Sequence, residues 1–95
     1  MSKLEEARVR LAAWYRVSML GEAAALLVDL DPDGRASPSD VRQRAHRLKG
    51  SGASFGFPDV TALAAKVEEA PEEQLNERAR ELVALLLHHG QAHTP

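Results

Sequence analysis

Prolines and glycines divide this chain of 95 residues into four stretches whose apolar residues recur at helical spacing. The breaks fall around Pro32-Asp33-Gly34, at Gly56-Phe57-Pro58 and at Ala70-Pro71. We therefore predict helices over roughly residues 3–30, 38–55, 58–70 and 71–89. Four helices with short connections predict an all-α fold, an up-down antiparallel four-helix bundle. At this length we expect one domain, residues 1–95.

The first predicted helix contains a shift of register near Gly21. Its apolar residues keep helical spacing on both sides of this glycine. One long helix bent at Gly21 and two helices broken there both fit the pattern, and the single bent helix is the preferred interpretation. Trp14 and Tyr15 are expected to supply core or helix-capping bulk rather than a ligand cage, because no other aromatic residue is near them in sequence.

The overall composition is that of an ordinary globular protein. Apolar residues make up 44% and charged residues 27% of the chain, a balance typical of folded domains. The net charge of −2 gives no overall attraction to nucleic acid or anionic lipid. The absence of cysteine excludes disulfides and thiolate zinc sites, and it agrees with a reducing compartment.

The N-terminal residues do not resemble a targeting segment. Met1-Ser2-Lys3-Leu4-Glu5-Glu6 lacks the apolar core of a signal peptide, and no apolar run approaches the roughly 20 residues of a membrane span. We therefore expect a cytoplasmic protein that does not enter a membrane. We also expect a monomer.

The second predicted helix contains glycines that oppose its helical pattern. Gly50 and Gly52 fall in its interior, where each costs about 1 kcal/mol relative to alanine. One face forms an apolar stripe that we expect to be buried, consisting of Val41, Ala45, Leu48, Gly52 and Phe55. His46 lies on the far side, beside Lys49, Gly50 and Ala53. The pattern predicts an exposed imidazole with a cation next to it and open space for an approaching group.

The residues from His46 onward resemble a known signature. The run H-R-L-K-G-S-G-A-S-F-G continues into further matching positions at Phe57, Val60, Leu63, Ala64, Val67 and Glu68. This stretch resembles the signature of histidine-containing phosphotransfer (HPt) domains. The resemblance implies a four-helix bundle in which His46 accepts a phosphoryl group from an aspartate of one receiver domain and passes it to another. Gly52 departs from the family, which often has serine or alanine there, and a looser helix is expected at that point.

The resemblance also implies partners and neighbouring roles. Response-regulator receiver domains are the expected partners, together with a hybrid sensor histidine kinase. Lys49 and Gly50 match the lysine and glycine that accompany the histidine in the family, and Lys49 is expected to offset the charge of the phosphoryl group. Helix geometry adds a set of residues expected to contact the partner: Arg42, Gln43, Arg47, Gly50 and Ala53.

The chain lacks the sequence features needed to use ATP alone. It has no phosphate-binding loop of the G-x-x-x-x-G-K-[ST] type and no convincing magnesium site near His46. We therefore expect no autonomous kinase activity and no cofactor or metal bound by this chain. The receiver domain is expected to supply Mg²⁺ and the acidic pocket.

Residues 29–40 carry the main rival signal. Acidic residues at positions 1, 3, 5 and 12 and glycine at position 6 fit most of the calcium-loop pattern D-x-D-x-D-G-x5-E. Ala36, the short Asp40 and Pro32 fit it poorly, and Ser37-Pro38-Ser39-Asp40 is also typical of a helix start. An EF-hand-like calcium-binding module is one alternative function. A second is a bundle that docks on receiver domains without carrying phosphate.

Three further histidines lie near the C-terminus. His88, His89 and His93 would need a continuous helix to align as metal ligands, and Gly90 is expected to end that helix near His89. With no carboxylate expected nearby, we predict no metal site there.

Overall fold

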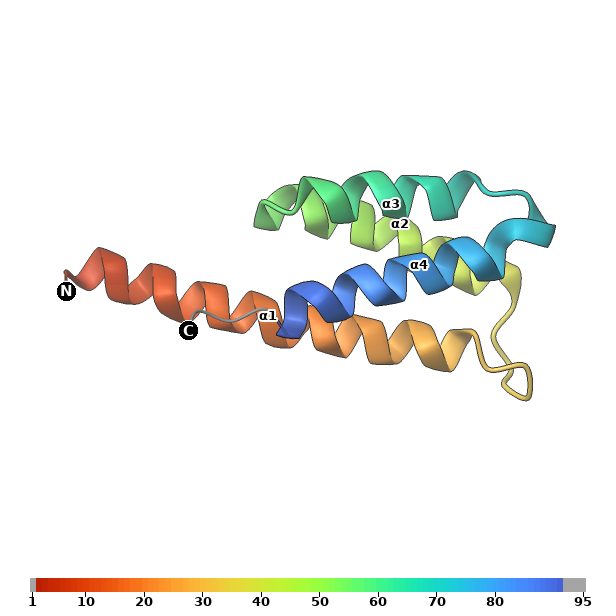
Figure 1. Ribbon diagram of the computed structural model, residues 1–95, viewed down its shortest axis with the longest axis horizontal. Coiled ribbons are helices and arrows are strands. Elements are labelled where there is room, and N and C mark those ends of the chain that lie inside the picture. Colours follow the sequence, from red (N-terminus) through yellow and green to blue (C-terminus); the bar gives the residue numbers. More distant parts are fainter. Residues whose placement is uncertain (1, 92–95) are drawn as a thin grey trace.

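The computed structural model describes residues 2–91 and contains four α-helices within them. The helices are α1 (Lys3–Asp29), α2 (Pro38–Phe55), α3 (Pro58–Glu69) and α4 (Glu72–Gln91). The part of the chain that is described contains no strand, which confirms the all-α prediction. Figure 1 shows the four helices as a bundle in which the chain turns back at each connection. The helix bounds differ from the predicted ones by at most two residues.

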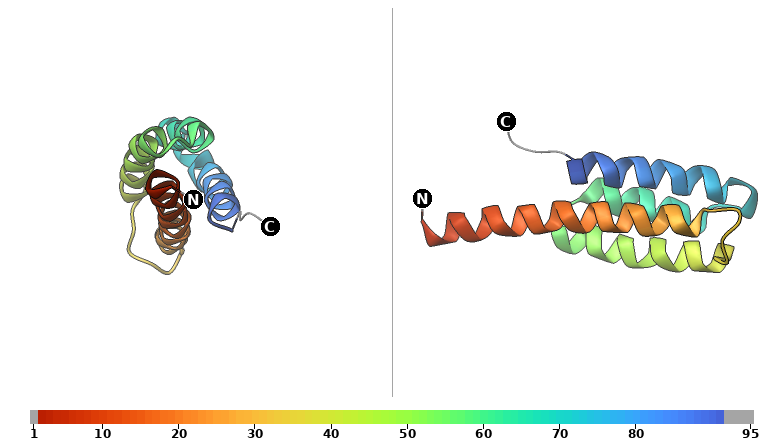
Figure 2. Two further views of the ribbon diagram at one scale, coloured as in Figure 1. Left: turned by 90° about the vertical axis from the view of Figure 1, so that its left-hand side faces the viewer. Right: turned by 90° about the horizontal axis from the view of Figure 1, so that it is seen from below.

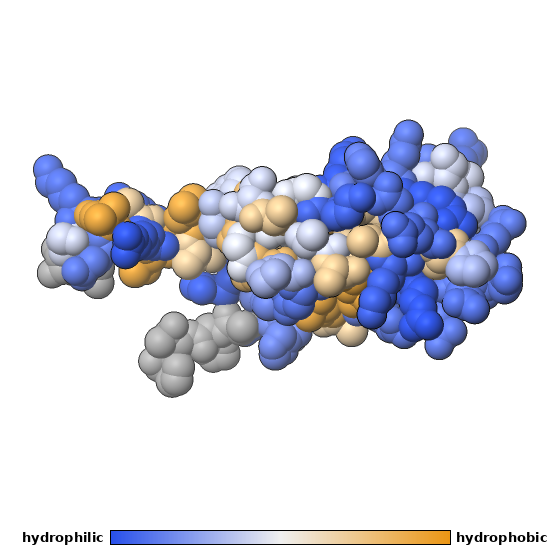
Figure 3. All heavy atoms as spheres, turned by 90° about the horizontal axis from the view of Figure 1, so that it is seen from above, coloured by the Kyte–Doolittle hydropathy of each residue, from blue (hydrophilic) through white to orange (hydrophobic). Residues whose placement is uncertain are grey.

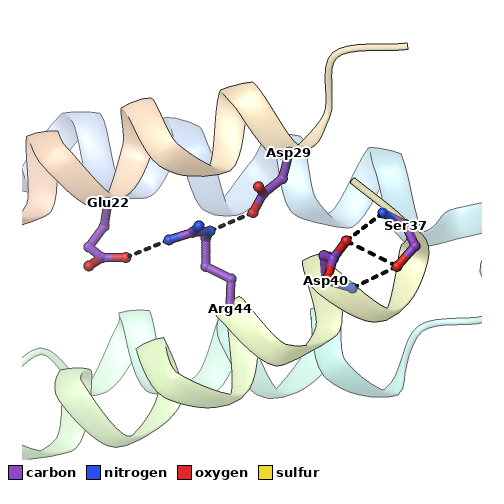
Figure 4. A network of polar contacts seen from close by, with 5 residues as sticks. All are labelled: Glu22, Asp29, Ser37, Asp40 and Arg44. Carbon is purple, nitrogen blue, oxygen red and sulfur yellow. Dashed lines mark hydrogen bonds and ion pairs between the residues drawn. The ribbon is translucent and has the colours of Figure 1, made fainter. Parts of the chain in front are cut away.

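Local signals explain where α2 begins and ends. The Ser37 hydroxyl accepts a hydrogen bond from Asp40 N–H, and the Asp40 carboxylate accepts one from Ser37 N–H (Figure 4). This reciprocal capping box satisfies two free donors at the helix start, and Pro38 occupies the first turn. The backbone hydrogen bond from Ser37 holds the pKa of Asp40 below its usual value. The helix ends at Gly56, whose φ of 81° is left-handed.

The helices pack unequally on one another. α2 packs mainly against α3, and α1 packs mainly against α4, whereas α1 and α2 contact each other little. Arg44 of α2 spans this weaker contact, because its guanidinium pairs with Glu22 and Asp29 of α1 (Figure 4). The ion pairs therefore join the α1–α4 pair to the α2–α3 pair.

A single hydrophobic core runs through all four helices. Its largest fully buried side chains are Met19, Leu26, Leu48, Leu82, Leu86, Val60 and Val67. The predicted apolar stripe of α2 is buried as expected at Val41, Ala45, Leu48 and Gly52. Phe55, the last member of the stripe, is half-buried. Burial of this face directs the opposite face of α2 toward solvent.

Two glycines permit helix contacts that the sequence pattern did not indicate. A Cβ at Gly52 would lie 2.6 Å from Thr61 Oγ1, so glycine at this position lets α3 approach α2 and does not simply loosen the helix. A Cβ at Gly90 would lie 2.5 Å from Leu20 Cγ of α1. Gly90 lies inside α4, and the prediction that it ends the helix near His89 is wrong. Close packing on α1 offsets the cost of about 1 kcal/mol for a helical glycine.

α1 is one uninterrupted helix that extends past the other three (Figures 1 and 2). It continues through Gly21 without a break, and the figures show no sharp kink along its length. Trp14 is 56% exposed, so the prediction that it supplies core bulk is wrong. Trp14 lies edge-on to Tyr15 and Phe55 at the rim of the bundle. Tyr15 is half-buried and stacks on Phe55.

By length and composition alone, α1 is the one helix within residues 2–91 that could cross a membrane. The expectation that no apolar run approaches a membrane span therefore does not hold for α1. Its C-terminal half packs in the bundle, where Met19, Ala23 and Leu26 are fully buried. Only 17% of its most apolar stretch is buried, however, and much of its apolar surface is therefore left uncovered by residues 2–91.

Candidate functional site

His46 lies on the outer face of α2, and its side chain is 66% exposed. The buried residues Ala45 and Leu48 hold this helix against the core and so fix the direction of the imidazole. A shallow hollow of about 310 Å³ beside the ring is lined by Gln43, His46 and Arg47. The prediction of an exposed imidazole is confirmed, and the ring is accessible to another molecule.

Glu68 of α3 faces His46 and Lys49 together. Its Oε1 lies 2.8 Å from His46 Nδ1, and its Oε2 lies 2.9 Å from Lys49 Nζ. Oε2 has no contact with solvent, so the Lys49 ammonium is the group that balances its charge. The hydrogen bonds from Lys49 and His46 hold the pKa of Glu68 below its usual value of 4.5. The Glu68 carboxylate is therefore ionised at neutral pH.

The charge of Glu68 determines which nitrogen of His46 carries the proton. An ionised carboxylate only accepts hydrogen bonds, so Nδ1 must donate the one that joins it to Glu68. In the neutral ring Nε2 is then unprotonated and has a free lone pair. Within residues 2–91, Nε2 of His46 makes no hydrogen bond. The site thus presents an oriented nucleophilic nitrogen at the surface.

The packing of α2 on α3 sets the position of this carboxylate. Gly52 removes the side chain that would hold the start of α3 away from α2. At the same level, Thr61 Oγ1 donates a hydrogen bond of 3.0 Å to the carbonyl oxygen of Lys49. These contacts place α3 beside the turn of α2 that carries His46 and Lys49.

Arg42 fixes the other end of α3. Its Nη1 donates hydrogen bonds to the carbonyl oxygens of Glu68, at 2.9 Å, and Ala70, at 2.7 Å. These carbonyls lie at the C-terminal end of α3, where a helix leaves acceptors without intrahelical partners. Arg42 is half-buried and its guanidinium is used inside the chain. Its geometry therefore favours a structural role over the predicted contact with a partner.

The other residues predicted to contact a partner lie on an open surface around His46. Gln43, Arg47, Gly50 and Ala53 are all exposed. The side chain of Arg47 makes no hydrogen bond or ion pair with any other residue in the described part of the chain. A Cβ at Gly50 would meet nothing within 4 Å, so no packing contact in the fold requires glycine there. The space over Gly50 is open to an approaching molecule.

The acidic residues of the loop 29–40 do not gather around a common point. The Asp29 carboxylate pairs with Arg44, and Asp40 belongs to the capping box of α2. Asp31 accepts a hydrogen bond of 2.9 Å from Asp33 N–H, which stabilises the turn. Among residues 2–91, no three His, Asp or Glu side chains are grouped so as to hold a metal ion. The geometry gives no support to the calcium alternative.

His89 forms a separate polar contact at the end of α4. Its Nε2 lies 2.8 Å from Asp59 Oδ2, and its ring lies against Phe57. The expectation that no carboxylate lies near is wrong, because Asp59 is 30 positions away in sequence but adjacent in the fold. Burial alone would raise the pKa of Asp59, but hydrogen bonds from His89 and Val60 N–H bring it below its usual value. His93 lies outside the described residues.

Glu68 is the site residue that sequence reasoning missed. It is the last residue of the stretch that resembles the HPt signature. Helical spacing cannot predict its contact with His46, because 22 positions separate the two residues. Two signals were available: the match of Glu68 to that signature, and its position on α3 beside the apolar residue Val67, which predicts a side chain at the edge of the α2–α3 contact.

Comparison with known families matches residues 4–92 to the family described as Hpt domain. The match extends over nearly the whole chain and includes both His46 and Glu68. No curated protein and no solved structure gives a significant match.

Proposed function

The chain belongs to the Hpt domain family, whose members act in two-component phosphotransfer, and on this premise we propose that it relays phosphoryl groups between receiver aspartates through His46. The observation that carries the proposal is the contact of Glu68 with His46 Nδ1, which leaves Nε2 free on an exposed ring. The proposal includes an up-down antiparallel arrangement of the four helices, with the reacting histidine on the outer face of α2.

In the accepting step, the lone pair of His46 Nε2 attacks the phosphorus of a receiver's aspartyl phosphate. The N–P bond forms as the bond from phosphorus to the aspartate oxygen breaks, and the aspartate carboxylate leaves with the bonding electrons. The proton on Nδ1 stays in place, so the ring becomes a cation. Glu68, ionised and 2.8 Å from Nδ1, stabilises that cation. Transfer to a second receiver aspartate reverses these bond changes.

Lys49 supplies the positive charge on the phosphoryl side of the site. It lies three residues after His46 on the same helix, so the two side chains are neighbours on the surface of α2. Its side chain is 38% exposed, and its ammonium is paired only with Glu68 among the described residues. Once the ring carries a positive charge that draws Glu68, the ammonium can turn to the anionic oxygens of the phosphoryl group.

The partner completes the site. We propose that a receiver domain docks over Gln43, Arg47, Gly50 and Ala53, and that it brings the Mg²⁺ on which phosphoryl transfer depends. A hybrid sensor histidine kinase is the proposed source of the phosphoryl group. Both partners would meet this chain in the cytoplasm.

Radiolabel transfer tests the proposal directly. The purified chain is mixed with a receiver domain that carries labelled phosphate on its aspartate, in the presence of Mg²⁺. The wild type should gain a label that is labile in acid and stable in base, and His46→Gln should gain none. His88→Gln, which alters an exposed histidine of α4, should accept label as the wild type does. An unlabelled wild type, or equal label on His46→Gln, would overturn the proposal and favour a bundle that only docks on receivers.

A further inference from the structure

The N-terminal part of α1 projects beyond the other three helices (Figures 1 and 2). Residues 2–14 are all exposed, and at 1.5 Å per residue this segment is roughly 20 Å long. Its exposed side chains include large apolar ones, with Leu4 62% and Leu11 49% exposed. A lone helix of this length is marginal in water unless an apolar face is covered. Within residues 2–91, no other element covers this segment.

One face of the projecting segment continues the buried face of α1. Met19, Ala23 and Leu26 face the core, and steps of three and four residues toward the N-terminus keep to the same side of the helix. These steps reach a set of residues that we call the projecting face: Leu4, Glu5, Arg8, Leu11, Ala12, Tyr15 and Arg16. Figure 3 shows apolar surface on the projecting end of the molecule.

A hollow of about 380 Å³ lies at the base of the projecting face. Five residues of that face line it, from Arg8 to Arg16, and the rim of the bundle supplies Phe55, Phe57 and His89. Tyr15 stacks on Phe55 with ring centroids 4.2 Å apart, so aromatic rings line part of the hollow. Such a hollow fits one apolar side chain of an approaching helix.

The charges of the projecting face are complementary to those of a second, antiparallel copy. Glu5 lies at the free end and Arg16 at the base, and neither side chain forms an ion pair within residues 2–91. If two projecting segments pair antiparallel with Leu4 of one opposite Arg16 of the other, each Glu5 lies beside an Arg16 of the other copy. Leu4 of each copy then lies over the hollow of the other.

We propose that two copies of this chain associate through the projecting faces of α1, in an antiparallel pair. In this pair Leu4 of each copy lies over the hollow of the other, and Glu5 of each copy lies beside Arg16 of the other. The pairing covers the apolar residues of the projecting face, and it forms two Glu5–Arg16 ion pairs between the copies. It differs from the expectation of a monomer. It does not depend on the proposed phosphotransfer, because His46 is not among the residues of the projecting face or of the hollow.

Charge distribution favours a second copy over a lipid bilayer as the occupant. The projecting segment also carries Glu6 and Arg10, which lie on the side of the helix opposite the projecting face. Charged residues therefore surround the segment, and they would lose their hydration if the segment spanned a bilayer. An antiparallel helix pair leaves Glu6 and Arg10 in water.

Charge reversal tests the pairing by sedimentation equilibrium over a range of protein concentrations. Glu5→Arg alone and Arg16→Glu alone should each weaken self-association by about tenfold, because two exposed ion pairs become two like-charge pairs. An equimolar mixture of the two variants should restore association, since every pair between unlike copies is again opposite in charge. Glu6→Arg and Arg10→Glu make the same charge changes on the opposite face and should associate as the wild type does.

Three results would overturn the proposal. The first is a wild-type protein that stays monomeric at every concentration. A monomeric wild type that sediments with vesicles of phosphatidylglycerol and phosphatidylcholine counts as the same result. The second is a dimer that Glu5→Arg and Arg16→Glu leave unchanged, and the third is a mixture of these variants that fails to associate. Leu11→Asp should abolish the dimer while the helical circular dichroism of the bundle is kept, because Leu11 is exposed in the single chain.

Discussion

His46 Nδ1 and Glu68 Oε1 lie 2.8 Å apart although 22 positions separate the two residues in sequence. The contact joins α2 to α3 at the surface, and the same carboxylate pairs with Lys49 through its second oxygen. One acidic side chain therefore orients the imidazole and holds the nearest cation. In the proposed relay, the reactivity of His46 depends on this shared contact.

Replacing Glu68 by glutamine should slow phosphotransfer without unfolding the protein. The amide keeps the shape of the side chain but cannot stabilise the cationic ring, so we expect transfer from a phosphorylated receiver to slow by about tenfold. The contact is partly exposed, so the free energy of unfolding should change by less than about 1 kcal/mol. Glu69→Gln, an exposed neighbour, is the matched control and should transfer normally. Equal rates for Glu68→Gln and the control would rule out the orienting role.

Lys49→Met should slow transfer several-fold without abolishing it, and it should also raise the pKa of Glu68. The hydrogen bond from Lys49 is the largest cause of the lowered pKa of Glu68, followed by that from His46. The pKa of Glu68 in the folded protein lies below the usual 4.5. The contribution of the ionised carboxylate to the free energy of unfolding is therefore complete above about pH 4.5, and it is lost as the pH falls through the folded-state pKa. Carbon-detected NMR titration of Glu68 in both proteins measures the shift. An unchanged pKa in Lys49→Met would contradict the ion pair.

The two glycines that follow Lys49 should respond in opposite ways to alanine. Gly50→Ala should raise the free energy of unfolding by about 1 kcal/mol, because the added methyl group meets no other atom and alanine favours helix. Gly52→Ala should lower it by about 1–3 kcal/mol, because the methyl group would overlap Thr61. Urea unfolding monitored by circular dichroism measures both values.

A larger residue at position 50, Gly50→Gln, should keep the fold and slow transfer. Unchanged transfer would show that the open space over Gly50 has no part in docking.

Arg42 and Arg47 should differ in what they affect. Arg42→Met should lower the free energy of unfolding by about 1–3 kcal/mol, because the carbonyls of Glu68 and Ala70 lose a charged donor. Arg47→Met should leave stability within about 0.5 kcal/mol of the wild type, since Arg47 is exposed, and should reduce the rate of transfer. Chemical denaturation and transfer assays on both variants separate the roles. A stable Arg42→Met with slow transfer would return Arg42 to the docking surface.

The helices and the direction of His46 were predictable because they depend on local rules. The spacing of Val41, Ala45 and Leu48 identified the buried face of α2, and proline and glycine marked the connections. Gly90 and Trp14 were predicted wrongly because their environments depend on where α1 lies. Gly90 packs closely on α1, and Trp14 lies on α1 where this helix extends past the bundle. Local propensity contains no information about such contacts.

Glu68 and Arg42 show why the chemistry of the site was less predictable than the fold. The orientation of His46 depends on an acid of another helix, and the position of that acid depends on how closely α3 packs on α2. Arg42 had the position of a surface residue in the helical pattern, but the free carbonyls at the end of α3 lie within its reach. Both contacts arise from the packing of two helices.

The position of the phosphoryl group on the imidazole tests the central claim most directly. After transfer from a phosphorylated receiver to protein with ¹⁵N-labelled histidine, a long-range ¹H–¹⁵N spectrum identifies the nitrogen that is coupled to phosphorus. The contact of Nδ1 with Glu68 predicts phosphorylation of His46 at Nε2, with the proton retained on Nδ1. Phosphorus on Nδ1 of His46, or on any other histidine, would contradict this account.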